Sequence, residues 1–244
     1  MDVVSGMHIN KKTDWVLIPA RNEEAALGKV IQNVRLVTDA PIVVVDSMSI
    51  DGTADVAKQM GATVISASQV GYLRALQTGY RFLLQQPDCS TVVQLDADGQ
   101  HHPLHIPRLT VHIHPDQSTP QWVVGSRHNT GTQADKALNL AGGLLRWYVE
   151  KISDHAYDDI SSGFWCLNRA TMKLFLQFTP PNQSADVAIR LFAARHGLFP
   201  IETPTEMGPR LSGQSMHHGI QMRLTHLSNL LQDMKWVNHM HLDR

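Results

Sequence analysis

The sequence has little cysteine, which excludes two kinds of protein. Its 244 residues include only two cysteines, Cys89 and Cys166, far apart in the chain. A disulfide-stapled domain needs several cysteines, and a zinc knuckle needs them in closely spaced pairs. Fourteen histidines are present, but their spacing gives no convincing zinc ligand set, so surface or core positions are favoured for them. The chain is long enough for one large or two small domains with an ordinary apolar core.

Excess positive charge and long apolar runs are also missing. The net charge is −1, whereas a nucleic-acid-binding protein normally carries a basic excess. No segment approaches the roughly 20 apolar residues of a membrane-spanning helix. The first residues lack the apolar centre of a signal peptide. We therefore expect a cytoplasmic protein that does not bind nucleic acid and whose membrane contact, if it has any, is peripheral.

What the sequence does have is a regular alternation of apolar runs and amphipathic segments. The runs predict buried strands, and the segments predict helices at about 24–37, 53–61 and 71–86, the first capped by Asn22. Strands that are apolar on both faces and alternate with helices are typical of a mostly parallel α/β sheet flanked by helices. The strands expected here are Trp15–Ala20, Ile42–Val45, Thr63–Ile65, Thr91–Leu95 and Trp122–Val124.

The second half of the chain is less regular and ends in an amphipathic segment, Ile220–Leu242. Apolar residues recur on one side of this predicted helix. Docking on the domain is favoured for it, and pairing with a second subunit or lying on a membrane surface are the alternatives. The apolar stripe consists of Ile220, Leu224, Leu227, Leu231, Met234 and Met240. The other elements expected are helices at Ala137–Ile152 and Ser184–His196, strands at Phe164–Leu167 and Phe199–Thr203, and a loop at 207–218.

Acidic residues stand near the ends of three predicted strands, where ligands of parallel sheets bind. Asp96 and Asp98 are two residues apart in an extended segment, which puts both side chains on one side, about 6–7 Å apart at Cα. Such a pair suits a hard divalent cation that also binds phosphate oxygens, with a solvated acidic turn as the alternative. Asp46 can bind a ribose hydroxyl or cap a turn. Glu23 can bind a nucleotide or favour a helix dipole.

Several motifs occur together in a fixed order. They are Pro19-x-x-Asn22-Glu23, Val44-Val45-Asp46-x-x-Ser49-x-Asp51-Gly52-Thr53, Asp96-Ala97-Asp98-Gly99-Gln100-His101, Gly125-Ser126-Arg127, Asp159-x-x-Ser162-Gly163-Phe164 with Arg169, and Arg210-x-x-Gly213-x-Ser215. Their combination resembles family 2 glycosyltransferases of the GT-A fold, over about residues 13–216. Within that family it is most similar to the dolichyl- or polyprenyl-phosphate mannose and glucose synthases.

The resemblance implies transfer of a sugar from a UDP- or GDP-linked donor with the help of Mg²⁺ or Mn²⁺. Asp96 and Asp98 would bind the metal together with the diphosphate. Arg127 would face the acceptor or the sugar phosphate, and Arg210 would close over the diphosphate. The residues that would line the nucleotide-sugar are Pro19, Ala20, Arg21, Glu23, Asp46, Ala97, Gln100 and Ser215.

The resemblance also implies a domain division and a mechanism. Residues 1–218 would form one glycosyltransferase domain, with a nucleotide-sugar half at 13–127 and an acceptor half at 128–218, and residues 219–244 would form the C-terminal helix. The expected reaction is an inverting displacement at the anomeric carbon. A hydroxyl acceptor needs a general base, for which Asp186 is the candidate. A lipid phosphate is already anionic and needs only positive charge, which Arg127 can supply.

The sequence departs from the family pattern at several positions. Ser47 replaces the usual second acid after Asp46, and Gly71-Tyr72-Leu73 replaces the usual Gly-Lys-Gly. Ala185-Asp186 stands where Glu-Asp is usual. Arg146-Trp147 lacks the Gln of the Gln-x-x-Arg-Trp motif of processive synthases, so we expect one sugar to be added per encounter. The alternative functions are a sugar nucleotidyltransferase and a non-catalytic nucleotide-sugar-binding subunit.

Overall fold

The chain folds around a seven-stranded sheet in the order β3-β2-β1-β4-β6-β5-β7. The computed structural model describes residues 14–114, 118–127, 133–183, 186–211 and 220–240. All neighbouring strands are parallel except β6, which runs antiparallel to both β4 and β5. The predicted mostly parallel α/β sheet is therefore confirmed. The strands are β1 (Asp14–Ala20), β2 (Ile42–Asp46), β3 (Thr63–Ser66), β4 (Thr91–Gln94), β5 (Trp122–Arg127), β6 (Trp165–Asn168) and β7 (Ile201–Thr205).

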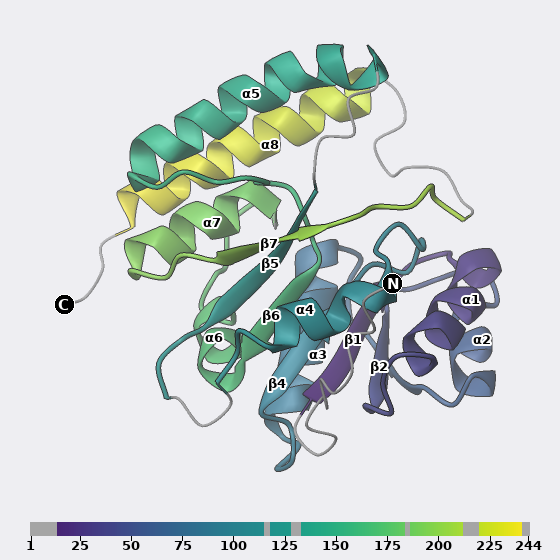
Figure 1. Ribbon diagram of the computed structural model, residues 1–244. Helices are drawn as coiled ribbons and strands as arrows, with labels where there is room; N and C mark the ends of the chain where they lie inside the picture. Colours follow the sequence, from purple (N-terminus) through teal and green to yellow (C-terminus); the bar gives the residue numbers. More distant parts are fainter. Residues whose placement is uncertain (1–13, 115–117, 128–132, 184–185, 212–219, 241–244) are drawn as a thin grey trace, which may run out of the picture.

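Helices cover both faces of the sheet (Figure 1). On one face α1, α2 and α4 pack their apolar residues around Ile18 and Val44, and on the other α3, α5, α6, α7 and α8 pack around Leu17 and Val43. The central strands are mostly apolar because both of their faces are buried. The helices are α1 (Glu24–Arg35), α2 (Thr53–Gln59), α3 (Tyr72–Leu84), α4 (Ile106–Thr110, after a 3₁₀ turn at Pro103–His105), α5 (Gln133–Ser153), α6 (Arg169–Phe175), α7 (Asp186–Arg195) and α8 (Ile220–His239).

The antiparallel direction of β6 and the short helices α4 and α6 were not predicted from the sequence, although the strand itself was expected at Phe164–Leu167. All four residues of β6 are buried, so their apolar pattern is the same whichever way the strand runs. The chain passes from β6 straight into α6, because Asn168 accepts a hydrogen bond from the Thr171 N–H and caps the helix. Helices of five and seven residues are too short to show a clear 3.6-residue period.

The C-terminal helix α8 packs against α7, and Figure 1 shows it running alongside α5. Among the side chains of α8 that the structure describes, the buried apolar ones are Leu230, Met234 and Val237. The predicted stripe is right for Met234 and wrong for Leu227 and Leu231, which are exposed. The side chains of Ile220 and Leu224 lie outside the described part of the structure. The buried residues recur at intervals of four and three, so the face that contacts the domain is rotated from the predicted one.

Polar contacts also hold α8 in place. Arg195 at the end of α7 donates to the carbonyl oxygens of Asn238 and Met240, at 3.1 and 2.7 Å. Asp233 is buried and accepts a hydrogen bond from the Asn182 N–H at 2.8 Å. Orphan carbonyls at a helix end need donors of this kind, so the contacts fix where α8 ends as well as how it lies.

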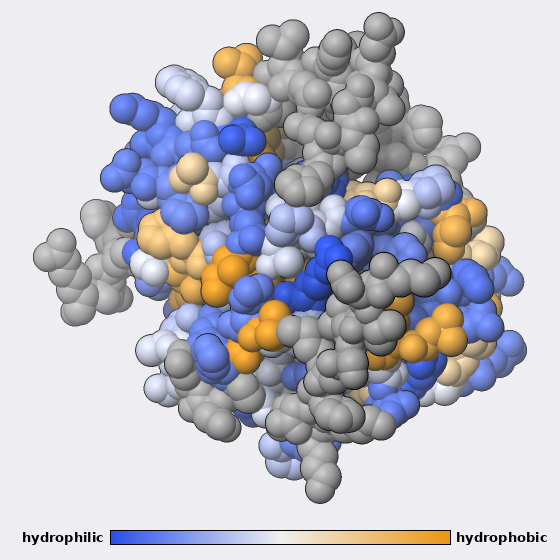
Figure 2. Space-filling view, in the orientation of Figure 1, coloured by the Kyte–Doolittle hydropathy of each residue, from blue (hydrophilic) through white to orange (hydrophobic). Residues whose placement is uncertain are grey.

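On the face shown in Figure 2, hydrophilic residues predominate, and apolar residues form several separate patches. Within the part of the chain that the structure describes, no helix combines the length and apolar character needed to cross a membrane. Cys89 and Cys166 are free and buried. Burial raises the pKa of the Cys89 thiol to about 12, so this cysteine stays protonated at neutral pH and is a poor nucleophile.

Candidate active site

The loops that follow β1 and β2 are tied together by hydrogen bonds. The Asn22 N–H donates to Ser49 Oγ, and the Ile50 N–H donates to Asn22 Oδ1, both at 2.9 Å. The Glu23 N–H donates to Thr53 Oγ1 at 2.8 Å. The prediction that Asn22 caps α1 is wrong. The helix starts after Glu23, and Asn22, with a φ of 54°, joins the two loops instead.

The predicted nucleotide-binding residues lie at the carboxyl ends of β1 and β2. Pro19 and Ala20 end β1 and are buried, and Ala20 is in register with Asp46, the last residue of β2. Asp46 Oδ1 accepts a hydrogen bond from the Ser49 N–H at 3.1 Å. Arg21 follows directly and is exposed. The structure thus brings these residues to one edge of the sheet.

The two predicted metal ligands lie in a tight turn after β4, and not in the extended segment that was expected from the sequence. Asp98 Oδ1 accepts a hydrogen bond from the Gln100 N–H at 2.9 Å, which closes the turn. Gly99 has a φ of 82°, in the left-handed region that favours glycine. Ala97 is buried, whereas the side chain of Asp96 is 34% exposed and can be reached by a ligand.

A segment distant in the sequence lies across this turn. The Gly208 N–H donates to the Gln100 carbonyl, and the Leu211 N–H donates to the Asp98 carbonyl, both at 2.9 Å. In Figure 1 this segment continues from β7 toward the side of the sheet that holds β1 and β2. These backbone bonds place Arg210 over the acidic residues.

Arg210 bridges two carboxylates from different loops. Its Nη2 lies 2.9 Å from Asp98 Oδ2, and its Nη1 lies 3.7 Å from Glu23 Oε1. The other oxygen of Glu23, Oε2, is buried and has no hydrogen-bond partner among the described residues. Burial and the negative charge of Asp98, opposed by Arg210, raise the pKa of Glu23 to about 7. Three ionisable side chains from three separate motifs therefore meet at one point.

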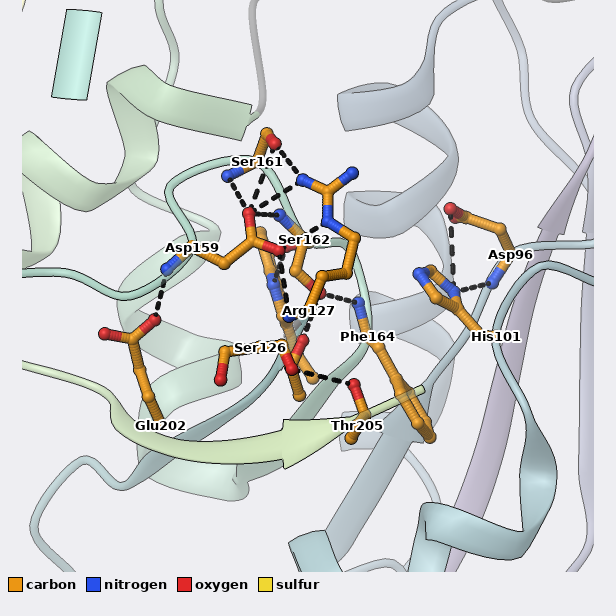
Figure 3. Close-up of polar contacts among 12 residues, drawn as sticks. Asp96, His101, Ser126, Arg127, Asp159, Ser161, Ser162, Phe164, Glu202 and Thr205 are labelled. Atoms are coloured by element: carbon orange, nitrogen blue, oxygen red, sulfur yellow. Dashed lines mark hydrogen bonds and ion pairs between the residues drawn. The ribbon is translucent and has the colours of Figure 1, made fainter. Parts of the chain in front are cut away.

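Asp96 is held by residues to which the sequence reasoning gave no role. Tyr72 donates a hydrogen bond to Asp96 Oδ1 at 3.0 Å. His101 Nδ1 accepts one from the Asp96 N–H at 3.1 Å, and the imidazole ring stacks on Phe164 with centroids 5.2 Å apart (Figure 3). The signal for Tyr72 was its place in the altered Gly71-Tyr72-Leu73 segment, but nothing in the sequence shows that this segment reaches Asp96.

The oxygen atoms of this turn fit Mg²⁺ or Mn²⁺. Among the described residues, no three His, Cys, Asp or Glu side chains are grouped to hold a metal ion. Mg²⁺, however, commonly uses one or two carboxylates and takes its other ligands from phosphate and water. Asp96 and Asp98 can provide that pair. Asp98 Oδ2 pairs with Arg210 in this structure.

Arg127, the predicted acceptor-side residue, is held by Asp159. Its Nε and Nη2 donate to the two carboxylate oxygens of Asp159 at 2.5 and 2.8 Å, and Nη2 also donates to Ser161 (Figure 3). Burial alone would raise the pKa of Asp159, but the hydrogen bonds and charge of Arg127 hold it well below its usual value. Glu202 accepts hydrogen bonds from the Asp158 and Asp159 N–H groups. The Arg127 guanidinium is therefore fixed in direction while its side chain stays 41% exposed.

The roles of all the predicted site residues stay predictions, and the side chains of two of these residues are not placed by the structure. Asp186 is the first residue of α7, and its side chain lies outside the described part of the structure. Ser215 lies outside the described residues altogether. The structure therefore brings together Glu23, Asp96, Asp98 and Arg210, and it places Arg127 in a separate polar cluster around Asp159.

Comparison with known proteins finds a matching family and several relatives. A sequence model of the family described as Glycosyl transferase family 2 matches residues 15–161, which include Glu23, Asp96 and Asp98. The dolichyl-phosphate hexose transferase of Haloferax volcanii is 31% identical over 131 residues, covering 53% of this chain and 54% of that protein. The undecaprenyl-phosphate mannosyltransferase of Micrococcus luteus is 27% identical over 220 residues, covering 83% and 86%. In some relatives the chain spans about half of their length, 42% and 54% in two of them.

Solved structures show the same fold. Glucosyl-3-phosphoglycerate synthase from Mycobacterium tuberculosis, in complex with Mn²⁺ and uridine-diphosphate-glucose, matches with a TM-score of 0.65 and 22% sequence identity. The match covers 92% of this chain and 79% of that one. At this level of identity the likeness concerns the fold alone.

Proposed function

Because this chain belongs to glycosyl transferase family 2, we propose that it moves one sugar, with inversion and without processivity, from a UDP- or GDP-linked donor to an acceptor. The observation that carries the proposal is the meeting of Glu23, Asp98 and Arg210 beside the turn of Asp96. This is the edge of the sheet, beyond the carboxyl ends of β1 and β4, where ligands of α/β proteins bind.

The diphosphate of the donor is the group that this arrangement suits best. The planar guanidinium group of an arginine such as Arg210 makes paired, charge-assisted hydrogen bonds to phosphate oxygens. The contacts of Arg210 with Glu23 and Asp98 hold this guanidinium group at the site before a donor binds. Asp46, at the end of β2, would contact the ribose or the base. A divalent cation bound by Asp96 and Asp98 would supply Lewis-acid stabilisation of the leaving diphosphate.

A polyprenyl phosphate is the acceptor that we propose. Two relatives are named for transfer to dolichyl phosphate and undecaprenyl phosphate. Arg127 supports the same choice, because Asp159 fixes its guanidinium while its side chain stays partly exposed, as docking of an anionic acceptor requires. A phosphate acceptor is already a nucleophile and needs no general base. A hydroxyl acceptor would need one, and Asp186 at the start of α7 is the candidate.

The donor is tested by release of nucleoside diphosphate from a panel of UDP- and GDP-sugars with polyprenyl phosphate present. We expect one donor to give release that requires both Mn²⁺ and the lipid phosphate, and that is lost in Asp98→Ala. Pyrophosphate release from a sugar phosphate and a nucleoside triphosphate would identify a nucleotidyltransferase instead. If no nucleotide-sugar binds in the presence of Mn²⁺, the proposal fails.

The acceptor is tested with Asp186→Asn. Transfer to a hydroxyl acceptor should be abolished in this variant, whereas transfer to polyprenyl phosphate should be only weakened, because the nucleophile is already charged. Arg127→Ala removes the positive charge that is proposed to dock the phosphate, so it should raise the KM for the lipid phosphate. An Asp186→Asn protein that is inactive with polyprenyl phosphate, yet still binds UDP and Mn²⁺, would contradict a phosphate acceptor.

A further inference from the structure

Tyr72 lies at the first turn of α3 and contacts one of the two carboxylates assigned to the metal. Its hydroxyl is 3.0 Å from Asp96 Oδ1. Within the described part of the chain, no other side chain donates a hydrogen bond to that carboxylate. His101 is close, with Nδ1 3.6 Å from Oδ2, but that nitrogen accepts the Asp96 N–H and so carries no proton to donate.

A buried chain of hydrogen bonds settles the direction of the Tyr72 hydroxyl. The Gly163 carbonyl can only accept, so the group of Gln94 that lies 3.1 Å from it must be the amide nitrogen. Gln94 Oε1 then faces Tyr80, whose hydroxyl donates to it at 2.6 Å. The second amide hydrogen of Gln94 points to the Tyr72 oxygen at 3.3 Å. The Tyr72 hydroxyl therefore donates its hydrogen bond to Asp96.

Two features of the backbone make room for Tyr72 and fix its position. A Cβ atom on Gly163 would lie 2.6 Å from the Tyr72 hydroxyl, so a side chain there would displace that group. At the start of α3, the Gly71 N–H donates to Ser47 Oγ at 3.3 Å. Ser47, another departure from the family pattern, thus contacts the residue that precedes Tyr72 at the start of α3.

We propose that Tyr72 is a positioning residue for the metal site, where its hydroxyl holds Oδ1 of Asp96 and leaves Oδ2 turned toward a divalent cation. The proposal rests on the proposed function, because it assumes that Asp96 binds a metal. Tyr72 supplies a neutral donor, so it orients the carboxylate without cancelling the charge that attracts the cation. Groups that hydrogen-bond to metal ligands typically change metal affinity by about 10–100-fold when they are removed.

The first test is Mn²⁺ binding to the full chain in the presence of UDP, measured from the electron paramagnetic resonance signal of free Mn²⁺. Tyr72→Phe should bind Mn²⁺ roughly tenfold more weakly than the wild type. Tyr148→Phe is the matched control, because it removes the same hydroxyl from a partly buried residue of α5. Equal affinity in the two variants would overturn the role of Tyr72.

The second test separates positioning from a general loss of packing. Gly163→Ala should weaken Mn²⁺ binding, because the new methyl group displaces the Tyr72 hydroxyl. In a protein that already carries Tyr72→Phe, the same change should cost little more, since the displaced group is gone. Effects that add fully would overturn the proposal. If Tyr72→Phe does not fold, Mn²⁺ binding to the single variant Gly163→Ala carries the test, and unchanged binding would overturn the proposal.

Mn²⁺ binding to the wild type separates a failure of the proposed function from a failure of the role of Tyr72. If the wild type binds no Mn²⁺ in the presence of UDP, the proposed metal-dependent function fails, and the role of Tyr72 fails with it. If the wild type binds Mn²⁺ and Tyr72→Phe binds it equally well, only the role of Tyr72 is wrong.

Discussion

At the scale of single residues, the two carboxylate oxygens of Asp98 make different contacts. Oδ1 accepts the hydrogen bond that closes its turn, and Oδ2 pairs with Arg210. Asp98→Asn should keep the turn but lose the charge needed for a metal. We expect the rate of sugar transfer to fall by roughly 100-fold or more, beyond the usual effect of residues that only orient a ligand. Transfer measured across a range of Mn²⁺ concentrations checks this. Asp88→Asn, in an exposed loop, is the control and should be unchanged.

Asp14, at the start of β1, gives a prediction for pH. Burial, partly offset by a hydrogen bond with Thr91, raises its pKa from 3.8 to about 6. The folded protein therefore binds more protons than the unfolded chain between these values, and the stability linked to Asp14 is present below pH 4 and lost as the pH rises through 6. Asp14→Asn should raise the melting temperature at pH 8 and not at pH 4. Asp55→Asn, on an exposed helix face, is the control and should not raise the melting temperature at pH 8.

Single residues of the site differ in how far the sequence predicts them. Glu23, Asp96 and Asp98 are predictable, because carboxylates after the strands of a parallel sheet mark the ligand edge. Tyr72 and Asp159 are not, because their contacts depend on how α3 and the loop before β6 pack in three dimensions. Such contacts leave no period or spacing in the sequence.

At the scale of elements, α6 and the end of α3 are joined by Arg169. Its guanidinium donates to the carbonyl oxygens of Leu84, Gln86 and Cys89, at 2.6, 2.9 and 2.6 Å. Arg169→Met would leave these carbonyls without their donor and should lower the free energy of unfolding by about 2–3 kcal/mol. Denaturant unfolding measures this.

The Arg169 prediction has a matched control on α5. Arg146 pairs with Glu150 at 2.9 Å in an exposed position, so Arg146→Met should cost less than about 0.5 kcal/mol. Mn²⁺ and UDP binding should be unchanged in Arg169→Met, since the residue contacts a helix end. Loss of ligand binding without loss of stability would show that Arg169, which belongs to one of the family motifs, acts in the site instead.

Element type was more predictable than element direction. The predicted strands coincide with all seven observed strands to within a few residues, because most of them are short apolar runs between turn residues. The antiparallel course of β6 could not be read in the same way, since a strand that is buried on both faces has no sequence sign of direction. The rotation of α8 was missed for a related reason: several apolar residues lie around this helix, and only packing on α7 selects Leu230, Met234 and Val237.

At the scale of the whole molecule, the site depends on strand order. β1 lies between β2 and β4, so the loops that carry Glu23, Asp46 and Asp96 emerge side by side. The chain then returns after β7 to bring in Arg210. A ligand that touches all of these loops should therefore stabilise the entire fold, because unfolding would have to release it.

UDP with Mn²⁺ provides the test at this scale. At about 100 times its Kd, a ligand that binds only the folded state adds about 2.7 kcal/mol of stability. For a chain of this size, that corresponds to a rise in Tm of roughly 5–10 °C. Thermal unfolding should show this rise with UDP and Mn²⁺ together, and much less with either alone, because the carboxylates of the β4 turn repel a diphosphate until a cation joins them. An Asp96→Asn/Asp98→Asn double variant should lose the dependence on Mn²⁺. A rise of the same size without Mn²⁺ would mean that Arg210 alone holds the diphosphate and that the acidic pair is not a metal site.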